Sequence, residues 1–189
     1  LLAAILGGGA STLAGLSGRT LTVLGDATLR GTPGDRLNLN PGAPWTLNVS
    51  GILKAVHANL SGNLAAGASG VADSSVNLGG NANWTFIDTI PPAAVTGFLA
   101  RKVGGHAVEL SWTGSASSDA DSVMLRYRTD GTYPANRTDG TLWRSVPKTR
   151  AIDTATGLSD KALYQFAAFT RDSSGNFALP TGQERDTAW

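Results

Sequence analysis

The spacing of apolar residues is the feature that most constrains how this chain can fold. Short runs of alternating apolar and polar residues are separated by glycine, asparagine, aspartate and proline at intervals of about ten residues. Helical periodicity, with an apolar residue every three or four positions, is missing almost throughout. We therefore predict an all-β protein, with clear alternation over residues 20–24, 45–49, 108–112 and 123–127.

Two adjacent prolines, Pro91 and Pro92, interrupt this pattern near the middle of the chain. Proline cannot donate a ladder hydrogen bond and holds its backbone extended, so the pair predicts a linker rather than a strand. The predicted organisation is an apolar N-terminal strand segment over 1–18, a first module over 19–88, a linker over 89–92 and a second domain over 93–189.

The first module contains alternating stretches that begin near Arg19, Trp45 and Ser75, about 25–30 residues apart. This spacing predicts either the coils of a β-solenoid or a small β-sheet rich in glycine and asparagine. Fewer than three clean coils are visible, and one coil cannot bury its apolar face alone. We therefore expect the N-terminal segment, a neighbouring copy or further sequence to complete this core.

Several segments of this module resemble a family pattern. Gly31–Asp35, Pro41–Ser50 and above all Gly80–Phe86 resemble a module common in large secreted bacterial repeat proteins. The resemblance covers residues 19–88. It implies β-solenoid-like rungs placed ahead of fibronectin-type domains.

The second domain resembles fibronectin type III domains over nearly its full length. Residues 95–98, 106–112 and 123–128 are similar to strands A, B and C of that family. The resemblance implies a β-sandwich with a tyrosine corner, in which Tyr164 hydrogen-bonds back to the preceding loop. The polar segment 129–141 departs from the family, because it carries the pentapeptide Arg-Thr-Asp-Gly-Thr twice. The implied core residues are Trp112, Tyr127, Leu158 and Tyr164.

No catalytic constellation can be assembled from the sequence. The two histidines, His57 and His106, lie in different halves, and neither has a neighbouring partner to activate it as a general base. Glu109 and Glu184 are the only glutamates, and neither is placed for acid–base chemistry. The absence of cysteine excludes disulfides, zinc–thiolate sites and cysteine nucleophiles. We predict that the chain is not an enzyme and uses no cofactor.

Oxygen-bearing side chains gather in two predicted loops, which contain Asp119 and Asp121 in one case and Asp172 and Asn176 in the other. Calcium takes six to eight oxygen ligands, but the sequence contains no twelve-residue calcium loop. Aspartate and asparagine are also common in turns because they hydrogen-bond to their own backbone. We predict turn roles and no metal site.

Charge argues against two classes of partner. Charged residues make up 15% of the chain and the formal net charge is +1, whereas nucleic-acid-binding proteins carry a basic excess on one face. The apolar run at residues 1–6 is too short to span a membrane. We predict no nucleic-acid partner and no membrane span.

Tryptophan and asparagine supply the remaining candidate sites. Trp143 and Trp189 are the best candidates for stacking on a sugar, whereas Trp45 and Trp84 suit the end of a coil or a subunit contact. Four triplets fit the N-glycosylation acceptor pattern, at Asn48, Asn59, Asn83 and Asn136.

The N-terminal segment suggests a function. Leu1, Leu2, Ile5 and Leu6 form an apolar strand ahead of three glycines, and such a strand can add to the open sheet edge of a neighbouring subunit. We therefore predict an extracellular or cell-surface structural protein, a homo-oligomer or homopolymer that forms a fibre or filament. Two alternatives stay open: a carbohydrate-binding or adhesion module that recognises surface carbohydrate, and a non-catalytic spacer of a larger secreted enzyme.

Overall fold

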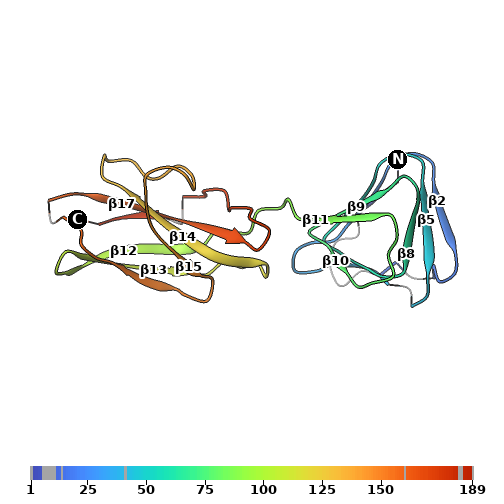
Figure 1. Ribbon diagram of the computed structural model, residues 1–189, viewed down its shortest axis with the longest axis horizontal. Coiled ribbons are helices and arrows are strands. Elements are labelled where there is room, and N and C mark those ends of the chain that lie inside the picture. Colours follow the sequence, from blue (N-terminus) through green and yellow to red (C-terminus); the bar gives the residue numbers. More distant parts are fainter. Residues whose placement is uncertain are drawn as a thin grey trace. The chain divides into compact units, whose positions relative to one another are not determined.

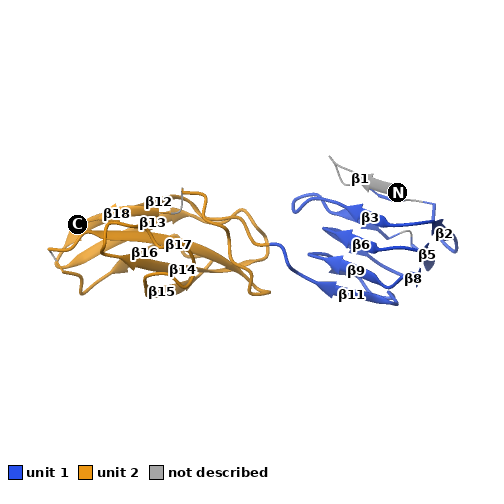
Figure 2. Ribbon diagram, turned by 90° about the horizontal axis from the view of Figure 1, so that it is seen from above, with its two compact units in different colours: residues 1–90 blue, residues 91–189 orange. Residues whose placement is uncertain are grey.

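The computed structural model describes residues 2–5, 12–13, 15–40, 42–159, 161–182 and 185–188. These residues contain β-strands and no helix, which confirms the all-β class. The chain divides into two compact units, Leu1–Ile90 and Pro91–Trp189, so the division falls within the predicted linker (Figure 2).

Unit 1 is a coil of short parallel strands. Three consecutive strands make one turn of the coil, and each turn adds one strand to each of three parallel sheets. Figure 2 shows β3, β6, β9 and β11 stacked in this way. The strands are β1 (Leu2–Ile5), β2 (Thr20–Val23), β3 (Ala27–Arg30), β4 (Leu37–Leu39), β5 (Trp45–Val49), β6 (Leu53–Val56), β7 (Ala58–Leu60), β8 (Asn63–Gly67), β9 (Gly70–Asp73), β10 (Val76–Asn77) and β11 (Trp84–Ile87).

The coils differ from their predicted positions. Three complete coils begin at Thr20, Trp45 and Asn63, so the third lies ahead of the predicted start near Ser75. The repeat shortens along the chain because the first coil contains longer turns, over residues 31–36 and 40–44, than the later ones. Period-2 alternation marks each strand but not the length of the turns between strands.

The N-terminal strand adds to one of the three sheets of unit 1. Leu2–Ile5 forms β1 and pairs in parallel with β3, from Leu2 opposite Ala27 to Ile5 opposite Arg30. These residues therefore pair within the chain, along the edge of β3, and contact of β1 with a neighbouring copy stays a proposal. Leu1 and Leu6 lie outside the described residues.

The core of unit 1 consists of side chains that point inward from all three sheets. Alternation puts every second residue of a strand inside, as in β5, where Trp45, Leu47 and Val49 are buried. Leucines from successive coils stack in the same way, including Leu39 and Leu60 on neighbouring strands. Within one sheet, between the paired strands β4 and β7, the side-chain amide of Asn59 donates to Asn38 Oδ1 at 2.8 Å.

Unit 2 is a β-sandwich of two antiparallel sheets (Figure 1). One sheet has the order β12-β13-β16 and the other the order β15-β14-β17-β18. This fold matches the fibronectin type III-like sandwich that the sequence resembles. The strands are β12 (Thr96–Gly104), β13 (Ala107–Thr113), β14 (Ala120–Arg128), β15 (Thr141–Pro147), β16 (Ile152–Ala155), β17 (Tyr164–Asp172) and β18 (Arg185–Ala188).

The sandwich core contains the residues that the family resemblance implies. Trp112, Leu158 and Tyr164 are buried between the sheets, and Tyr127 packs against them. The Ser159 N–H donates to Tyr164 Oη at 2.8 Å, which is the geometry of a tyrosine corner. This bond fastens the loop that carries Leu158 to the end of the sandwich.

The polar segment 129–141 covers the outer face of one sheet. β17 is buried on both sides, so Ala167 and Phe169, which point away from the sandwich core, are as protected as Phe166. Tyr133 Oη lies 2.7 Å from Thr187 Oγ1, which ties the segment to β18. Both copies of the pentapeptide contribute an aspartate, Asp130 and Asp139, to ion pairs with Arg128.

Candidate functional site at the end of the coil

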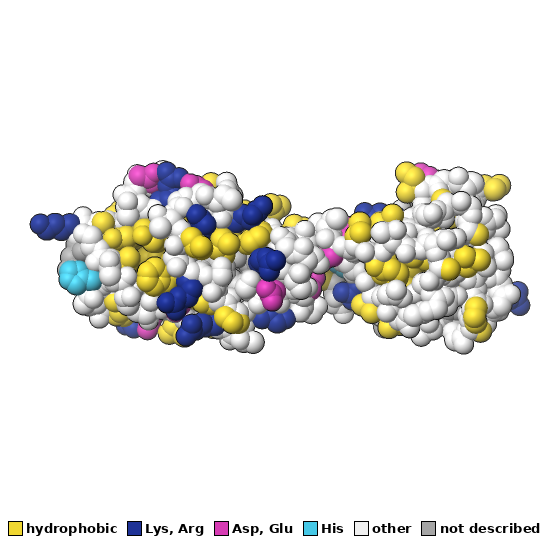
Figure 3. Space-filling view, viewed as in Figure 1, with side chains coloured by type: hydrophobic (Ala, Val, Ile, Leu, Met, Phe, Trp, Pro, Cys, Tyr) yellow, Lys and Arg dark blue, Asp and Glu magenta, His cyan; other side chains and the backbone are white. Residues whose placement is uncertain are grey.

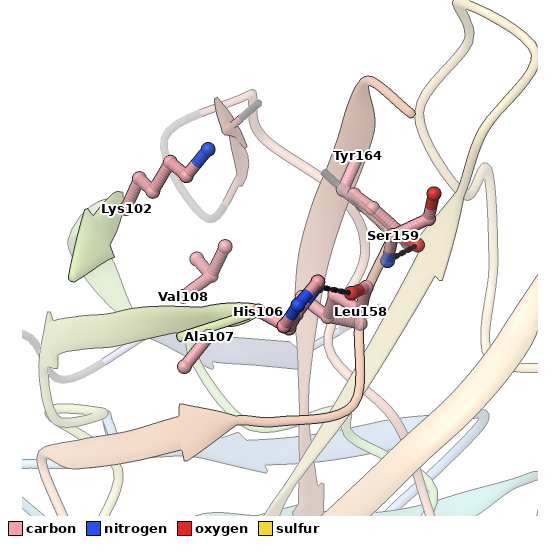
Figure 4. Close-up of a pocket in the computed structure, with 7 residues that line it drawn as sticks. All are labelled: Lys102, His106, Ala107, Val108, Leu158, Ser159 and Tyr164. Carbon is pink, nitrogen blue, oxygen red and sulfur yellow. Dashed lines mark hydrogen bonds between the residues drawn. The ribbon is translucent and has the colours of Figure 1, made fainter. Parts of the chain in front are cut away.

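The two histidines occupy turns, one in each unit. His57 follows β6 with a φ of 49° and is buried, whereas His106 lies in the β12–β13 hairpin with a φ of 61°. His106 Nδ1 is 3.1 Å from the carbonyl oxygen of Leu158 (Figure 4). The hollow beside it has a volume of about 10 Å³, room for no more than one water molecule.

The predicted oxygen cluster is divided among separate turn interactions. The buried carboxylate of Asp172 accepts hydrogen bonds from the backbone N–H of Asn176 at 2.7 Å and from its side chain at 2.8 Å. Asp121 pairs with Arg171, and the Asp119 carbonyl accepts the Ser173 N–H. Across the described ranges, no three acidic or histidine side chains are grouped to hold a metal ion.

Glu109 and Trp143 each have a polar partner of their own. Glu109 forms an ion pair with Arg101 at 3.0 Å, and Glu184 lies outside the described residues. Trp143 is half-buried, donates its indole N–H to Asp153 at 3.2 Å, and has the Arg144 guanidinium 5.7 Å from its ring centroid. Trp189 also lies outside the described residues, and Trp45 is buried inside the coil.

The four candidate glycosylation asparagines differ in exposure. Asn83 and Asn136 are exposed, whereas Asn48 and Asn59 are half-buried on strands. The Asn83 side chain donates to the Ala65 carbonyl at 3.1 Å. Asn136 Oδ1 accepts both the N–H and the hydroxyl of Thr138, so its side chain forms part of a turn.

The most organised set of side chains closes the C-terminal end of the coil. Trp84, on β11, lies in the same column as Gly70 on β9, where the absence of a side chain leaves room for the indole. A Cβ atom on Gly70 would lie 2.4 Å from Trp84 Cε3. Phe86 on β11 is paired with Ala72 on β9, so its ring also lies over a small residue. Two aromatic rings over two small residues therefore seal the core.

A buried asparagine fixes this aromatic seal. Asn63, which is fully buried, accepts the Trp84 indole N–H at 2.5 Å. Its own backbone N–H donates to Asn81 Oδ1 at 3.0 Å. The buried side-chain oxygen of Asn63 has the indole N–H as its partner, whereas the amide nitrogen has no partner in the described part of the chain, so the bond to the oxygen is what holds Trp84 in its orientation. The sequence indicated Trp84 as a candidate end-closing residue, but Asn63 was not recognised because it follows a turn in an Asn-rich region.

A second group of polar residues ties the chain to the coil as it leaves β11. Asp73, on β9, is buried and accepts hydrogen bonds from the Thr89 N–H at 2.9 Å and the Thr89 hydroxyl at 2.7 Å. Lys54 pairs with the same carboxylate at 3.3 Å. The Ser74 hydroxyl donates to Asp88, so two successive residues of the exit segment are held. We call this group, Lys54, Asp73, Ser74, Asp88 and Thr89, the exit clasp.

The exit clasp makes the stability of unit 1 depend on pH. Burial by itself would raise the pKa of Asp73, but the hydrogen bonds from Thr89 and the Lys54 ammonium outweigh it and hold this pKa below its ordinary value of 3.8. A carboxyl group with a lowered pKa stabilises the folded state above its unfolded pKa. That stabilisation is lost as the pH falls through the pKa that the carboxyl group has in the folded state.

We therefore expect unit 1 to lose stability below about pH 4. Hydrogen exchange of residues 84–90, measured between about pH 6 and about pH 2 with correction for intrinsic rates, should show this loss. Asp73→Asn removes the titrating group and should flatten the pH profile of this segment. If hydrogen-exchange protection of this segment falls equally steeply with pH in Asp73→Asn, other carboxylates cause the loss of stability.

Comparison with known proteins assigns no family to the chain. No protein-family model matches the chain, and no curated protein matches it. Several solved structures match over about half of the chain, and fibronectin-type domains are among them. The FN1–FN3 domains of chicken CNTN1 are 11% identical, with a TM-score of 0.46 over 56% of this chain and 34% of that one. A Fn3-like protein from Clostridium thermocellum is 23% identical, with a TM-score of 0.38 over 48% and 85%.

A further match is the spore cortex lytic enzyme SleM of Clostridium perfringens, which is 18% identical, with a TM-score of 0.38. It covers 52% of this chain and 28% of that enzyme, so this chain spans well under two thirds of SleM and of the CNTN1 structure. The assignment of unit 2 as a sandwich rests on its own strand order and register. In the described part of the chain, no helix has the length and apolar character needed to cross a bilayer.

Proposed function

We propose that this chain is a non-catalytic structural segment of an extracellular or cell-surface protein, and that it associates with copies of itself into a fibre by β-strand addition. One observation carries the proposal. The sheet β1-β3-β6-β9-β11 contains five strands, whereas each of the other two sheets of the coil contains three. In the described residues the other two sheets are each lengthened by a single bridge, Thr12 opposite Asn38 and Ala82 opposite Leu64, so β1 and β11 are the outermost full strands at the two ends of the coil.

Parallel pairing makes these two ends complementary. Every strand of the sheet runs in the same direction and in register, from β1 through to β11. A strand like β1 therefore has the direction needed to continue the sheet after β11. Head-to-tail contacts close into a ring only for particular rotations between neighbouring copies. For other rotations they produce an open fibre.

The surface of unit 1 agrees with such an arrangement. Residues 1–90 contain four basic and four acidic residues, and Figure 3 shows that the visible face of unit 1 is mostly uncharged. Charges that face each other in a stacked assembly would repel or need partners, and the low charge avoids this cost. The extracellular location follows from the resemblance to secreted repeat proteins and stays part of the proposal.

Electron microscopy and sedimentation of the purified chain test this function. We expect assemblies that grow with concentration and show a regular repeat. Deleting residues 1–10 removes β1, and we expect the shortened chain to sediment as a monomer with unit 2 still folded. A full-length chain that stays monomeric at high concentration would overturn the proposal, and so would fibres that persist without residues 1–10.

The alternatives of carbohydrate binding and enzyme spacing have separate tests. Quenching of tryptophan fluorescence by a polysaccharide would favour a carbohydrate-binding module. The predicted stacking residue Trp143 is half-buried, and its indole N–H is bonded to Asp153. A gene that encodes a much longer chain with a catalytic domain would favour the spacer.

A further inference from the structure

We infer that the outer edge of β11 is the acceptor site of this assembly, and that its occupant is β1 of a second copy of the chain. The inference rests on the proposed function and specifies its interface. It is carried by three properties of β11: the direction of its backbone groups, its lack of edge protection and the apolar side chains around it.

The backbone of β11 presents hydrogen-bonding groups on its outer side. The Gly70 N–H donates to the Asn83 carbonyl at 2.9 Å, and the Ser74 N–H donates to the Ile87 carbonyl at 2.8 Å. Peptide groups alternate in direction along a strand, so those of Trp84 and Phe86 point away from β9. Among the described residues, β9 is the only strand that pairs with β11.

β11 lacks the devices that protect other edges of this molecule. Natural edge strands are blocked by charges, proline, bulges or short length. The Ala100 N–H of edge strand β12 is occupied by the Asp186 carboxylate at 2.9 Å, and β10 has only two residues. β11 reads Trp-Thr-Phe-Ile, with no charge or proline, and it pairs with β9 without a register shift.

Apolar side chains surround this edge. Trp84 and Phe86 are only half-buried, although each packs against the core of the coil. Ile87 on β11 is 41% exposed, and at the end of the sheet that contains β10, Val76 and Leu78 are 38% and 52% exposed. A strand added to β11 would bury part of this surface, which contributes roughly 25 cal/mol for each Å² of apolar area.

The exit clasp keeps the edge accessible. Asp88 and Thr89 are bonded to Ser74 and Asp73 on the preceding coil. The chain that follows Ile87 is therefore drawn toward the end of β9 instead of running back along β11. The fold thus leaves the last strand of the sheet uncovered by its own exit segment.

The occupant is defined by direction and register. A strand that continues this sheet must run parallel to β11, and β1 begins the same sheet at the other end. Pairing places Ala3, Thr28, Lys54, Val71 and Thr85 in one column. If the column continues into a second copy, Ala3 of that copy lies opposite Thr85.

A cysteine pair tests this register, because the natural sequence contains no cysteine. Within one chain, β3, β6 and β9 separate Ala3 from Thr85, which puts their Cα atoms about 19 Å apart. A disulfide requires a Cα separation below about 7 Å, so Ala3→Cys combined with Thr85→Cys can link only different copies. We expect a ladder of disulfide-linked oligomers on a non-reducing gel. In the matched pair Ala3→Cys with Thr154→Cys, strand pairing does not align the two thiols, so we expect no ladder beyond background oxidation.

A charge variant tests the edge without relying on cysteine chemistry. Thr85 is exposed on β11, so Thr85→Lys should leave the fold intact and weaken association at least about tenfold by sedimentation. Thr154→Lys makes the same change on β16 of unit 2, and we expect no effect. Thermal unfolding of both variants checks that the coil is folded.

The outcomes separate this inference from the proposed function. Suppose that the natural chain assembles, that Thr85→Lys assembles equally well, and that the Ala3–Thr85 cysteine pair gives no more ladder than the Thr154→Cys control. These results would overturn the β11 site and leave fibre formation standing. A natural chain that never assembles would overturn both. A ladder specific to the Ala3–Thr85 pair, together with weakened association of Thr85→Lys, supports the site.

Discussion

Phe166→Ala is expected to destabilise unit 2 by about 3–5 kcal/mol, the range for removing a buried phenylalanine from a core. Phe166 is fully buried on β17, and its ring lies 5.8 Å from that of Tyr127 and 6.1 Å from that of Tyr164. The neighbours are held by two hydrogen-bonded sheets, so they cannot collapse to fill the cavity. Because the two units have separate cores, unit 1 should keep its stability.

Urea unfolding followed by hydrogen exchange of each unit measures this effect. Leu179→Ala is the matched control, because Leu179 is 74% exposed and its truncation should change stability by less than about 0.5 kcal/mol. Equal losses in both variants would mean that the aromatic cluster does not form the core of the sandwich. Loss of protection in unit 1 would show that the two units unfold together.

Gly70→Val is expected to displace the aromatic seal of unit 1. A Cβ atom at this position would lie 2.4–2.6 Å from three carbons of the Trp84 indole, closer than atoms can approach. Overpacking of this kind costs about 1–3 kcal/mol. Displacing Trp84 also removes the donor bonded to the buried Asn63 Oδ1, and a buried group left without its partner costs a further 1–3 kcal/mol or so.

Stability and tryptophan fluorescence report this change. We expect a lower unfolding midpoint for unit 1 and a red-shifted emission, because Trp84 becomes exposed to water. Gly34→Val is the control, since a Cβ atom at Gly34 meets no atom within 4 Å and its φ is not positive. If Gly70→Val matched this control in both measurements, Trp84 would not be seated over Gly70.

The features that could be predicted from the sequence are local in origin. Alternation with a period of two depends only on neighbouring residues, so it indicated the strand at 45–49 and the all-β class before any partner was known. The proline pair at Pro91 and Pro92 acts on its own backbone, and it marked the boundary between the units. The side chains of the sandwich followed from a family pattern that covers most of unit 2.

The end of the coil could be predicted only in part. Trp84 stood out because it is a large side chain in a region of small ones. Its partner Asn63 and the exit clasp around Asp73 could not be recognised in the sequence. Asparagine, serine and aspartate are also ordinary turn residues in this chain. Only their stacking in successive coils shows that they are bonded to one another.

By itself, the sequence determined the strand-forming segments, the division at the prolines and the sandwich core, since each depends on residues close together in the chain or on a family pattern. The tertiary structure decided the number of coils, the pairing of β1 with β3, the use of residues 129–141 as a cover for β17 and the uncovered edge at β11. These features depend on parallel pairing between residues that are distant in the sequence. Turn length, which alternation does not encode, sets which of those residues meet.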